Sequence, residues 1–445
     1  MRQRAGNLID KTRDAVPEGT FAVGGGLMIT AITTYVFLII VRQALPNDHV
    51  YSAFNAFWGF IFVAGPGLFL PLEQEVGRAL AHRTAQGVGG GPLVHRAARL
   101  GAMLTAIMAI AAVATAPLYV KSFFQGDWLL IASLAIGLFG FAFMHLTRGT
   151  LSGNGRFRPY GMILAIDGAA KLVASIVLWQ LGVHTAGPYG MCIALSPFLA
   201  TGIALRGQTG LLREGPPAPY SELSTSLGWL LAGSLLMQVL GYSVLLGVGI
   251  LRHHRDARVA AGLSSAFFVG RIPPLLFQAV QGTLLPKLAG LAGTGRHDDF
   301  KRGLHQLMVI VVGIAALGTA GAFAVGVPVG KLLFGANKFN VTAVNLGLLV
   351  AGNGIFIIAL TIAQALIALH GHKEAAMAWG VGVVAFLIGA AAISDLALRV
   401  EIGFLAGSVV TTLVMAWALL RRMRHGVTEG IGSLIAQIEH EPLDL

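Results

Sequence analysis

The sequence predicts an all-α integral membrane protein with about twelve transmembrane helices. Of its 445 residues, 55% are hydrophobic and only 11% are charged, and the mean hydropathy is +0.75. Soluble domains carry about 25% charged residues, so this chain has too few to cover a surface that faces water. The 59 glycines also fit, because glycine lets apolar helices approach one another closely in a membrane.

Mostly apolar windows recur along the chain at the length of about 20 residues that crosses a bilayer. In order they cover 21–41, 51–72, 100–119, 128–147, 160–182, 187–205, 226–250, 259–285, 304–327, 341–368, 374–394 and 400–420. The longest loops between them, 73–99 and 206–225, are too short for a separate catalytic or nucleotide-binding domain.

The basic residues indicate the orientation. With the N-terminus inside, 21 of the 31 Lys and Arg residues fall on the cytoplasmic side, 8 fall outside, and Lys171 and Arg271 lie within windows. Cytoplasmic loops carry the excess of cations, so we expect a multi-pass protein of the cytoplasmic (inner) membrane with both termini in the cytoplasm. The membrane topology then accounts for the net charge of +11, and we expect no nucleic-acid partner. The loop 251–258 breaks the rule.

The loop 206–225 lies midway along the chain and contains Pro216, Pro217 and Pro219. We interpret it as a cytoplasmic linker between two six-helix bundles; an ordinary exposed loop would look the same. The expected domains are a cytoplasmic lead at 1–20, the bundles at 21–205 and 226–420, and a cytoplasmic tail at 421–445. Two halves with an even number of spans would be parallel repeats.

Motifs for catalysis are missing. The sequence has no G-x-x-x-x-G-K-[ST] phosphate loop and no Asp-x-Asp pair, and its Cys and His residues do not have the spacing of metal ligands. The single cysteine, Cys192, excludes an intrachain disulfide. We therefore expect no enzyme, no cofactor and no metal.

Ionisable residues inside spans are costly and suggest function. Asp167 and Lys171 are four residues apart, on one face of a helix, where they can pair. They are either a self-neutralised pair or a site that binds substrate or a coupling proton. Arg148 ends the fourth window and is either an ordinary cytoplasmic cation or a contact for a lipid phosphate. Glu75 and Arg78, at the end of the second window, lie one turn apart and can also pair.

Arg271 is the strongest candidate for a substrate contact. It lies in the eighth window without an acidic residue within one turn, and Pro273 after it is expected to kink the helix. Gln278 and Gln281 continue the same helix. We expect the guanidinium to face a water-filled cavity or an anion. The rival is a salt bridge across the bundle, for example to Asp167 or Glu75.

Several stretches resemble a known family. They are the run from Gly65 to Glu75 (GPGLFLPLEQE), the turn from Arg148 to Gly153, Asp167-Gly168, Arg271-Ile272-Pro273, the run from Gln278 to Leu288, and Leu332 to Gly335. The chain resembles actinobacterial polysaccharide-biosynthesis membrane proteins of the multidrug/oligosaccharidyl-lipid/polysaccharide exporter superfamily. Within that superfamily it is most similar to the Wzx-like oligosaccharide flippases.

The resemblance implies two six-helix bundles around a central cavity that opens alternately to either side. It implies a flippase for a polyprenyl-(di)phosphate-linked glycan, with glycosyltransferases or a polymerase of the same pathway as partners. The substrate contacts then comprise Arg271, Lys171, Asp167, Gln278, Gln281 and Arg148. The first window carries no charge, which counts against lipid II as the substrate.

Two alternatives stay open: a multidrug or metabolite exporter of the same architecture, and a membrane enzyme of cell-envelope glycan assembly. A drug exporter would favour an acidic cavity, whereas the cations Lys171 and Arg271 inside these windows favour an anionic substrate. An enzyme would favour a large external loop.

Overall fold

The computed structural model describes residues 20–219, 222–223, 227–251, 256–272 and 297–439, with side chains up to residue 423. All secondary structure in these ranges is helical. Ten of the described helices are long and apolar enough to cross a membrane, and the bent pair α8–α9 makes eleven when it counts as one span. The predicted all-α, multi-pass membrane fold is thus confirmed.

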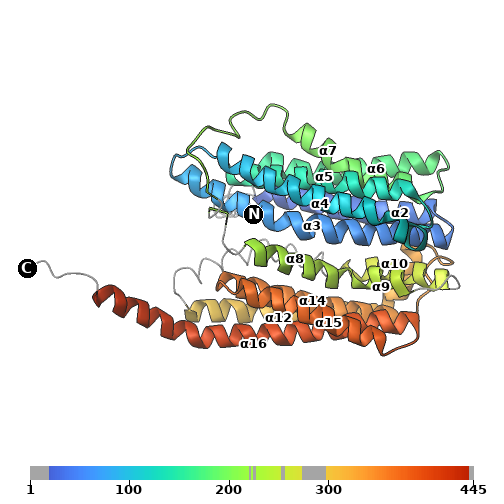
Figure 1. Cartoon of the computed structure of the whole chain (residues 1–445). Coiled ribbons are helices and arrows are strands. Elements are labelled where there is room, and N and C mark those ends of the chain that lie inside the picture. The colour runs from blue at the N-terminus through green and yellow to red at the C-terminus, as the bar shows by residue number, and fades with distance from the viewer. Residues whose placement is uncertain (1–19, 220–221, 224–226, 252–255, 273–296, 440–445) are drawn as a thin grey trace, which may run out of the picture. The chain divides into compact units, whose positions relative to one another are not determined.

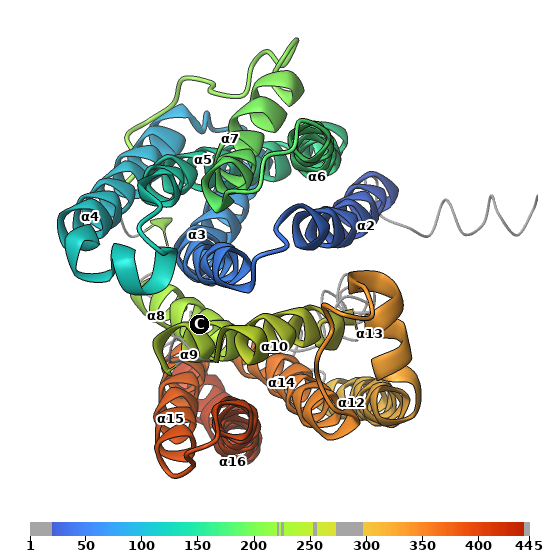
Figure 2. The ribbon, with the colours of Figure 1, turned by 90° about the vertical axis from the view of Figure 1, so that its right-hand side faces the viewer.

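The first of two compact units comprises Met1–Gln238, Leu245–Ser264 and Lys331–Asn340. Its main helices are α2 (Thr20–Ala44), α3 (Asp48–Ala85), α4 (Gly91–Phe124), α5 (Trp128–Gly153), α6 (Phe157–Gln180) and α7 (Ala186–Ala204). Helix α5 packs against α3, α4 and α7, and α6 packs against α2 and α7 (Figures 1 and 2). The buried face of α3 makes it the central helix of this unit, since most of its residues are shielded from the surroundings.

The second unit comprises Val239–Val244, Ser265–Gly330 and Val341–Leu445. Its helices are α12 (His297–Gly321), the π-helical turn η3 (Ala322–Gly326), α14 (Ala343–Ala368), α15 (His372–Ala391) and α16 (Leu396–Glu439). Helix α13 (Val327–Phe334) belongs to this unit up to Gly330 and to the first unit from Lys331. Helix α16 packs along both α14 and α15, and α12 packs along α14. α14 is the most buried helix of this unit among the described residues.

The helices α8 (Leu227–Gly241) and α9 (Ser243–Leu251) are bent by 61° at the break between them. Gly241 is the last residue of α8, and the carbonyls at the end of a helix lack the hydrogen bond that a continuous helix would give them. Helix α10 (Ala257–Gly270) is the described part of the predicted window 259–285; the rest of that window lies outside the described residues.

Local sequence explains where several helices begin. Asn47 caps α3 by accepting a hydrogen bond from the backbone N–H of His49 (2.9 Å). Asp127 caps α5 in the same way and also accepts a bond from the backbone N–H of Gly187 (2.7 Å), which ties α7 to α5. Helix α3 runs to Ala85, beyond the predicted end at residue 72, because hydropathy marks where lipid ends and not where the helix ends.

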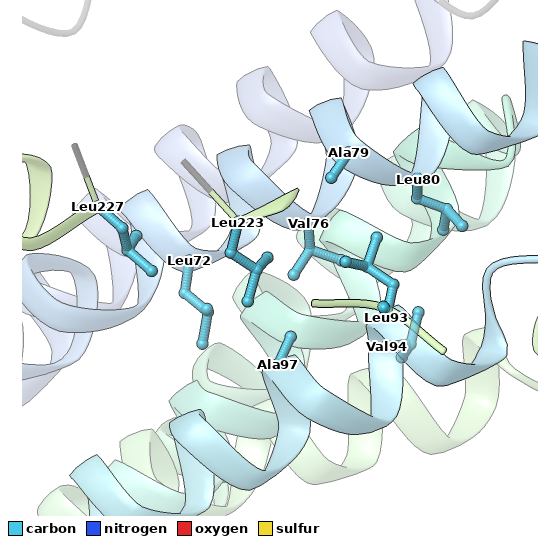
Figure 3. Close-up of a cluster of buried hydrophobic side chains, with 10 residues drawn as sticks. Leu72, Val76, Ala79, Leu80, Leu93, Val94, Ala97, Leu223 and Leu227 are labelled. Carbon is cyan, nitrogen blue, oxygen red and sulfur yellow. The ribbon is translucent and has the colours of Figure 1, made fainter. Parts of the chain in front are cut away.

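The predicted linker packs onto the first unit. Ala218 and Leu223 are buried in a hydrophobic cluster with residues of α3 and α4, which include Leu72, Val76 and Leu93 (Figure 3). A Cβ at Gly89 would overlap the carbonyl of Glu214, so glycine is required for this close approach.

Arg83, near the end of α3, fixes the linker further. Its guanidinium bonds both carboxylate oxygens of Glu222 (2.7 and 2.8 Å) and the carbonyls of Pro216 (3.1 Å) and Pro217 (3.3 Å). The segment is therefore well anchored in its described part. The division into domains at 206–225 stays a prediction, because the two compact units are not continuous in the sequence.

Candidate functional site

A buried polar cluster lies in the first unit, where three helices meet. We call it the Glu73 cluster; it consists of Glu73 on α3, His145 and Arg148 on α5, and Tyr160 on α6. Glu73 accepts a hydrogen bond from the Tyr160 hydroxyl (2.8 Å), lies 2.6 Å from Nδ1 of His145 and forms an ion pair with Arg148 (3.1 Å). Arg148 also donates to the Tyr160 hydroxyl (2.7 Å).

The cluster compensates its own charge. The single carboxylate of Glu73 faces the single guanidinium of Arg148, and both side chains are buried. The guanidinium also lies over the Tyr160 ring, 4.8 Å from its centroid, which adds a cation–π contact. Glu73 and Tyr160 thus hold the Arg148 guanidinium inside the cluster. In the turn that follows α5, Arg156 contacts the linker through the side chain of Gln208 (2.8 Å) and the carbonyl of Thr209 (2.6 Å).

The predicted pairing of Asp167 with Lys171 on α6 is confirmed. The Lys171 ammonium lies 2.9 Å from one oxygen of Asp167, and the Ser196 hydroxyl on α7 donates to the other oxygen (2.7 Å). Lys171 is only 5% exposed. This geometry agrees with a self-neutralised pair; a role in binding substrate stays a prediction. The predicted pair of Glu75 with Arg78 is also present, at 2.8 Å.

Arg271 follows α10 in the second unit and lies among aromatic rings. Its guanidinium carbon is 4.8 Å from the ring centroid of Tyr242, 4.9 Å from that of Phe267 and 5.8 Å from that of Phe356. One of its N–H groups donates to the carbonyl of Gly241, the residue at the α8–α9 break. The arginine therefore satisfies a backbone group that the break exposes, while the rings hold the guanidinium plane in place.

The two acids proposed as rival partners of Arg271 have cationic partners of their own, since Asp167 pairs with Lys171 and Glu75 with Arg78. Gln278, Gln281 and the expected kink at Pro273 lie outside the described residues. Among the residues that the structure describes, no three His, Cys, Asp or Glu side chains are arranged to hold a metal ion.

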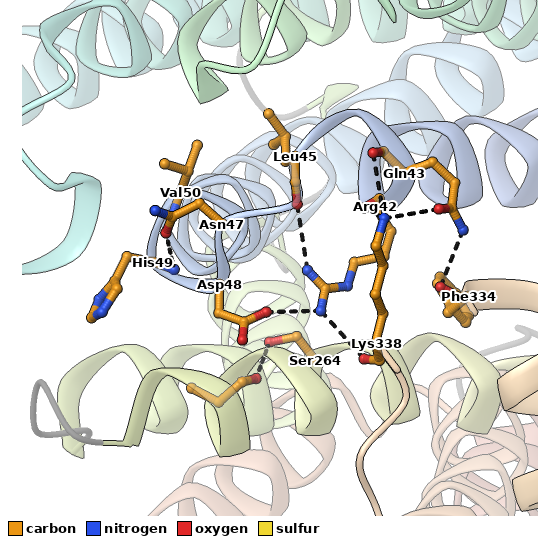
Figure 4. Close-up of polar contacts among 11 residues, drawn as sticks. Arg42, Gln43, Leu45, Asn47, Asp48, His49, Val50, Ser264, Phe334 and Lys338 are labelled. Atoms are coloured by element: carbon orange, nitrogen blue, oxygen red, sulfur yellow. Dashed lines mark hydrogen bonds and ion pairs between the residues drawn. The ribbon is translucent and has the colours of Figure 1, made fainter. Parts of the chain in front are cut away.

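Sequence reasoning missed another buried cation, Arg42 at the end of α2, which is 2% exposed. It pairs with Asp48 (2.8 Å), donates to the carbonyl of Lys338 (3.3 Å) and lies 4.4 Å from the ring centroid of Tyr51. The Lys338 ammonium in turn donates to the side chain of Gln43 (2.8 Å; Figure 4).

We call these five residues the Arg42 clasp. Burial lowers the pKa of Lys338, and the neighbouring Arg42 guanidinium lowers it further. The clasp fixes the segment after α13 to the turn between α2 and α3. The sequence gives no signal for it, because nearly 300 residues separate its two parts.

No protein-family profile matches the chain. Two uncharacterized proteins of Mycobacterium tuberculosis are similar to it. One is 26% identical over 436 residues, which are 95% of this chain and 98% of the relative. The other is 27% identical over 378 residues, which are 82% of this chain and 84% of the relative.

Solved structures give a clearer match in three dimensions. The inward-facing conformation of a multidrug resistance MATE family transporter of the MOP superfamily superimposes with a TM-score of 0.70 at 15% identity, covering 92% of this chain and all of that chain. An outward-facing conformation of such a transporter gives 0.62 at 14% identity, covering 92% of this chain and 98% of that chain. At this level of identity the likeness concerns the fold, and the chain has the fold of the MATE transporters.

Proposed function

We propose that the protein carries a polyprenyl-(di)phosphate-linked glycan from the cytoplasmic to the outer leaflet by alternating access. The MATE fold supports a transporter, because solved proteins of that fold have been captured in inward-facing and outward-facing conformations. A substrate that binds the two states differently shifts the balance between them, and transport needs no covalent chemistry. Glycosyltransferases or a polymerase of the same pathway would supply or consume the substrate.

Arg271 is the residue that supports an anionic substrate. A guanidinium presents a planar fork of N–H donors that matches paired phosphate oxygens. The rings of Tyr242, Phe267 and Phe356 lie against the guanidinium and orient this fork. Because arginine has five N–H donors, it can keep its bond to the Gly241 carbonyl and still bind a phosphate.

The other predicted contacts receive a supporting role in this proposal. Arg148 and Lys171 are buried against carboxylates, and each would have to leave its ion pair before it could bind a phosphate. Removing one partner of a buried pair costs about 3–5 kcal/mol, which opposes such an exchange. We therefore assign the phosphate contact to Arg271, and assign Asp167, Lys171 and Arg148 to the stability of the first unit.

The test uses purified protein in liposomes with a fluorescent polyprenyl-diphosphate-linked oligosaccharide, whose movement is followed by a quencher added outside. Loss of a hydrogen bond to a charged group costs about 1.5–3 kcal/mol, or roughly a tenfold to hundredfold change. Arg271→Ala should lose at least that much flipping rate. Arg271→Lys should lose part of it, because lysine keeps the charge without the fork. Arg302→Ala, at an exposed arginine of the same unit, is the control and should flip normally.

A wild-type rate in Arg271→Ala would overturn the assignment. The second candidate, a multidrug or metabolite exporter, is favoured by the solved structures with this fold, which are multidrug resistance transporters. Efflux of a cationic dye from the same liposomes, without movement of the glycolipid, would support the exporter and reject the flippase.

A further inference from the structure

The side chain of Glu401 is an acid buried in the second unit that the proposed transport mechanism does not use. It lies in the second turn of α16 and is 0% exposed. One carboxylate oxygen accepts a hydrogen bond from the side-chain amide of Asn345 on α14 (3.0 Å). The other oxygen is buried and accepts no hydrogen bond from any residue in the described ranges.

The geometry of α14 determines how Asn345 faces this acid. Thr342 and Asn345 form a capping box at the start of α14. The amide oxygen of Asn345 accepts bonds from the backbone N–H (3.2 Å) and the hydroxyl (2.5 Å) of Thr342. The amide nitrogen is therefore left to donate to Glu401. Asn345 offers a neutral donor, and it cannot offset a negative charge.

The charged groups near Glu401 do not offset its charge either. Helix α14 contains no titratable residue, and those of α15 lie in its first turn, at the end far from Leu396. On α16 itself, Asp395 accepts from the backbone N–H of Leu398 (2.9 Å), and Arg399 donates to the carbonyl of Ala390 (3.0 Å). No ion pair joins Glu401 to a cation within the described part of the chain.

A buried carboxylate with one neutral donor favours the protonated form. Ionisation would place an uncompensated charge among apolar helices, whereas the neutral acid needs only hydrogen bonds. We propose that Glu401 is a proton-binding site within the membrane and holds a proton at neutral pH. The proton comes from water and resides on the oxygen that has no donor, while the other oxygen keeps its bond from Asn345.

A monovalent metal ion fits this site less well than a proton. Such an ion requires several oxygen ligands, and the amide oxygen of Asn345 is already occupied by Thr342. The inference does not depend on which substrate the protein transports, because proton binding can be measured without transport.

The experiment is an infrared titration of the purified, full-length protein in liposomes. A protonated carboxylic acid has a C=O stretching band that an ionised one lacks. We expect such a band at neutral pH in the wild type, absent from Glu401→Gln and retained in Glu214→Gln, whose acid is exposed. Absence of any difference between wild type and Glu401→Gln would overturn the proposal.

A second variant keeps the test decisive if Glu401→Gln does not fold. Asn345→Leu removes the amide donor, so the C=O band should move to higher frequency while the acid stays protonated. A band that does not move would contradict the assignment. The titration is repeated with sodium replaced by choline, and a band that disappears only in sodium would show a metal-ion site instead of a proton site.

Discussion

Glutamine in place of Glu73 keeps the shape of the side chain and removes its charge. The Arg148 guanidinium, 3.1 Å away and buried, would then lack the carboxylate that compensates it, whereas Tyr160 and His145 could still hydrogen-bond to the amide. Breaking a buried pair from one side costs about 3–5 kcal/mol. Because the neutral contacts can persist, we expect a loss of about 3 kcal/mol in the free energy of unfolding.

Equilibrium unfolding in mixed micelles, with increasing amounts of a denaturing detergent, measures this loss. Glu75→Gln is the matched control on the same helix, because its partner Arg78 is 55% exposed and can turn to water. A pair with one solvent-exposed partner costs less to break than a fully buried pair, so the loss in Glu75→Gln should be smaller than in Glu73→Gln. Glu73→Gln combined with Arg148→Met should be more stable than Glu73→Gln alone, since it removes the uncompensated charge. Equal losses for Glu73→Gln and Glu75→Gln would refute the reasoning.

Three further predictions concern the first unit. Replacing both Asp167 and Lys171 should cost less unfolding free energy than replacing either, and additive losses in a double-mutant cycle would contradict their pairing. Cysteines introduced at 214–219 in a cysteine-free chain should react only with reagents on the cytoplasmic side; labelling from outside would reject the two-half topology. The hydrogen bond from Arg83 lowers the pKa of the Glu222 carboxyl below its value of about 4.3 in unfolded chains. The anchoring of the linker should therefore be fully present above about pH 4.3 and weaken as the pH falls through the pKa of Glu222 in the folded protein. Limited proteolysis of the linker measures this anchoring, and the Arg83→Met variant should be cleaved equally fast at neutral and acidic pH.

The fold was accessible from sequence because hydropathy is a local property. Each predicted window from 21–41 to 187–205 corresponds to one helix of the first unit. Two features were not accessible. The bend of 61° between α8 and α9 occurs within one apolar window, and apolar composition carries no information on direction. The extension of α3 to Ala85 follows from helix propensity and packing on the linker, beyond the stretch that meets lipid.

The polar contacts divide along the same line. Pairs within one helix, such as Asp167 with Lys171, follow from a spacing of four residues. The contact of Glu73 with His145 joins positions 72 residues apart, and that of Arg42 with Lys338 joins positions 296 apart. A single sequence does not indicate which distant positions are in contact, so the Glu73 cluster and the Arg42 clasp could not be predicted.

The way in which each buried cation is stabilised separates a structural role from one in binding. Arg148 is stabilised by a carboxylate, so its loss leaves Glu73 buried without a counter-charge and should destabilise the protein before it affects transport. Arg271 packs against aromatic rings and donates to the neutral carbonyl of Gly241, so alanine there removes cation–π contacts and a hydrogen bond to a neutral group. We therefore expect Arg148→Ala to lower the unfolding free energy by about 3 kcal/mol or more. Arg271→Ala should lose less unfolding free energy than Arg148→Ala and lose flipping activity. Both quantities are measured on the same liposome preparations, and the reverse order, with Arg271→Ala the unstable variant and Arg148→Ala the stable but inactive one, would place the phosphate contact in the first unit.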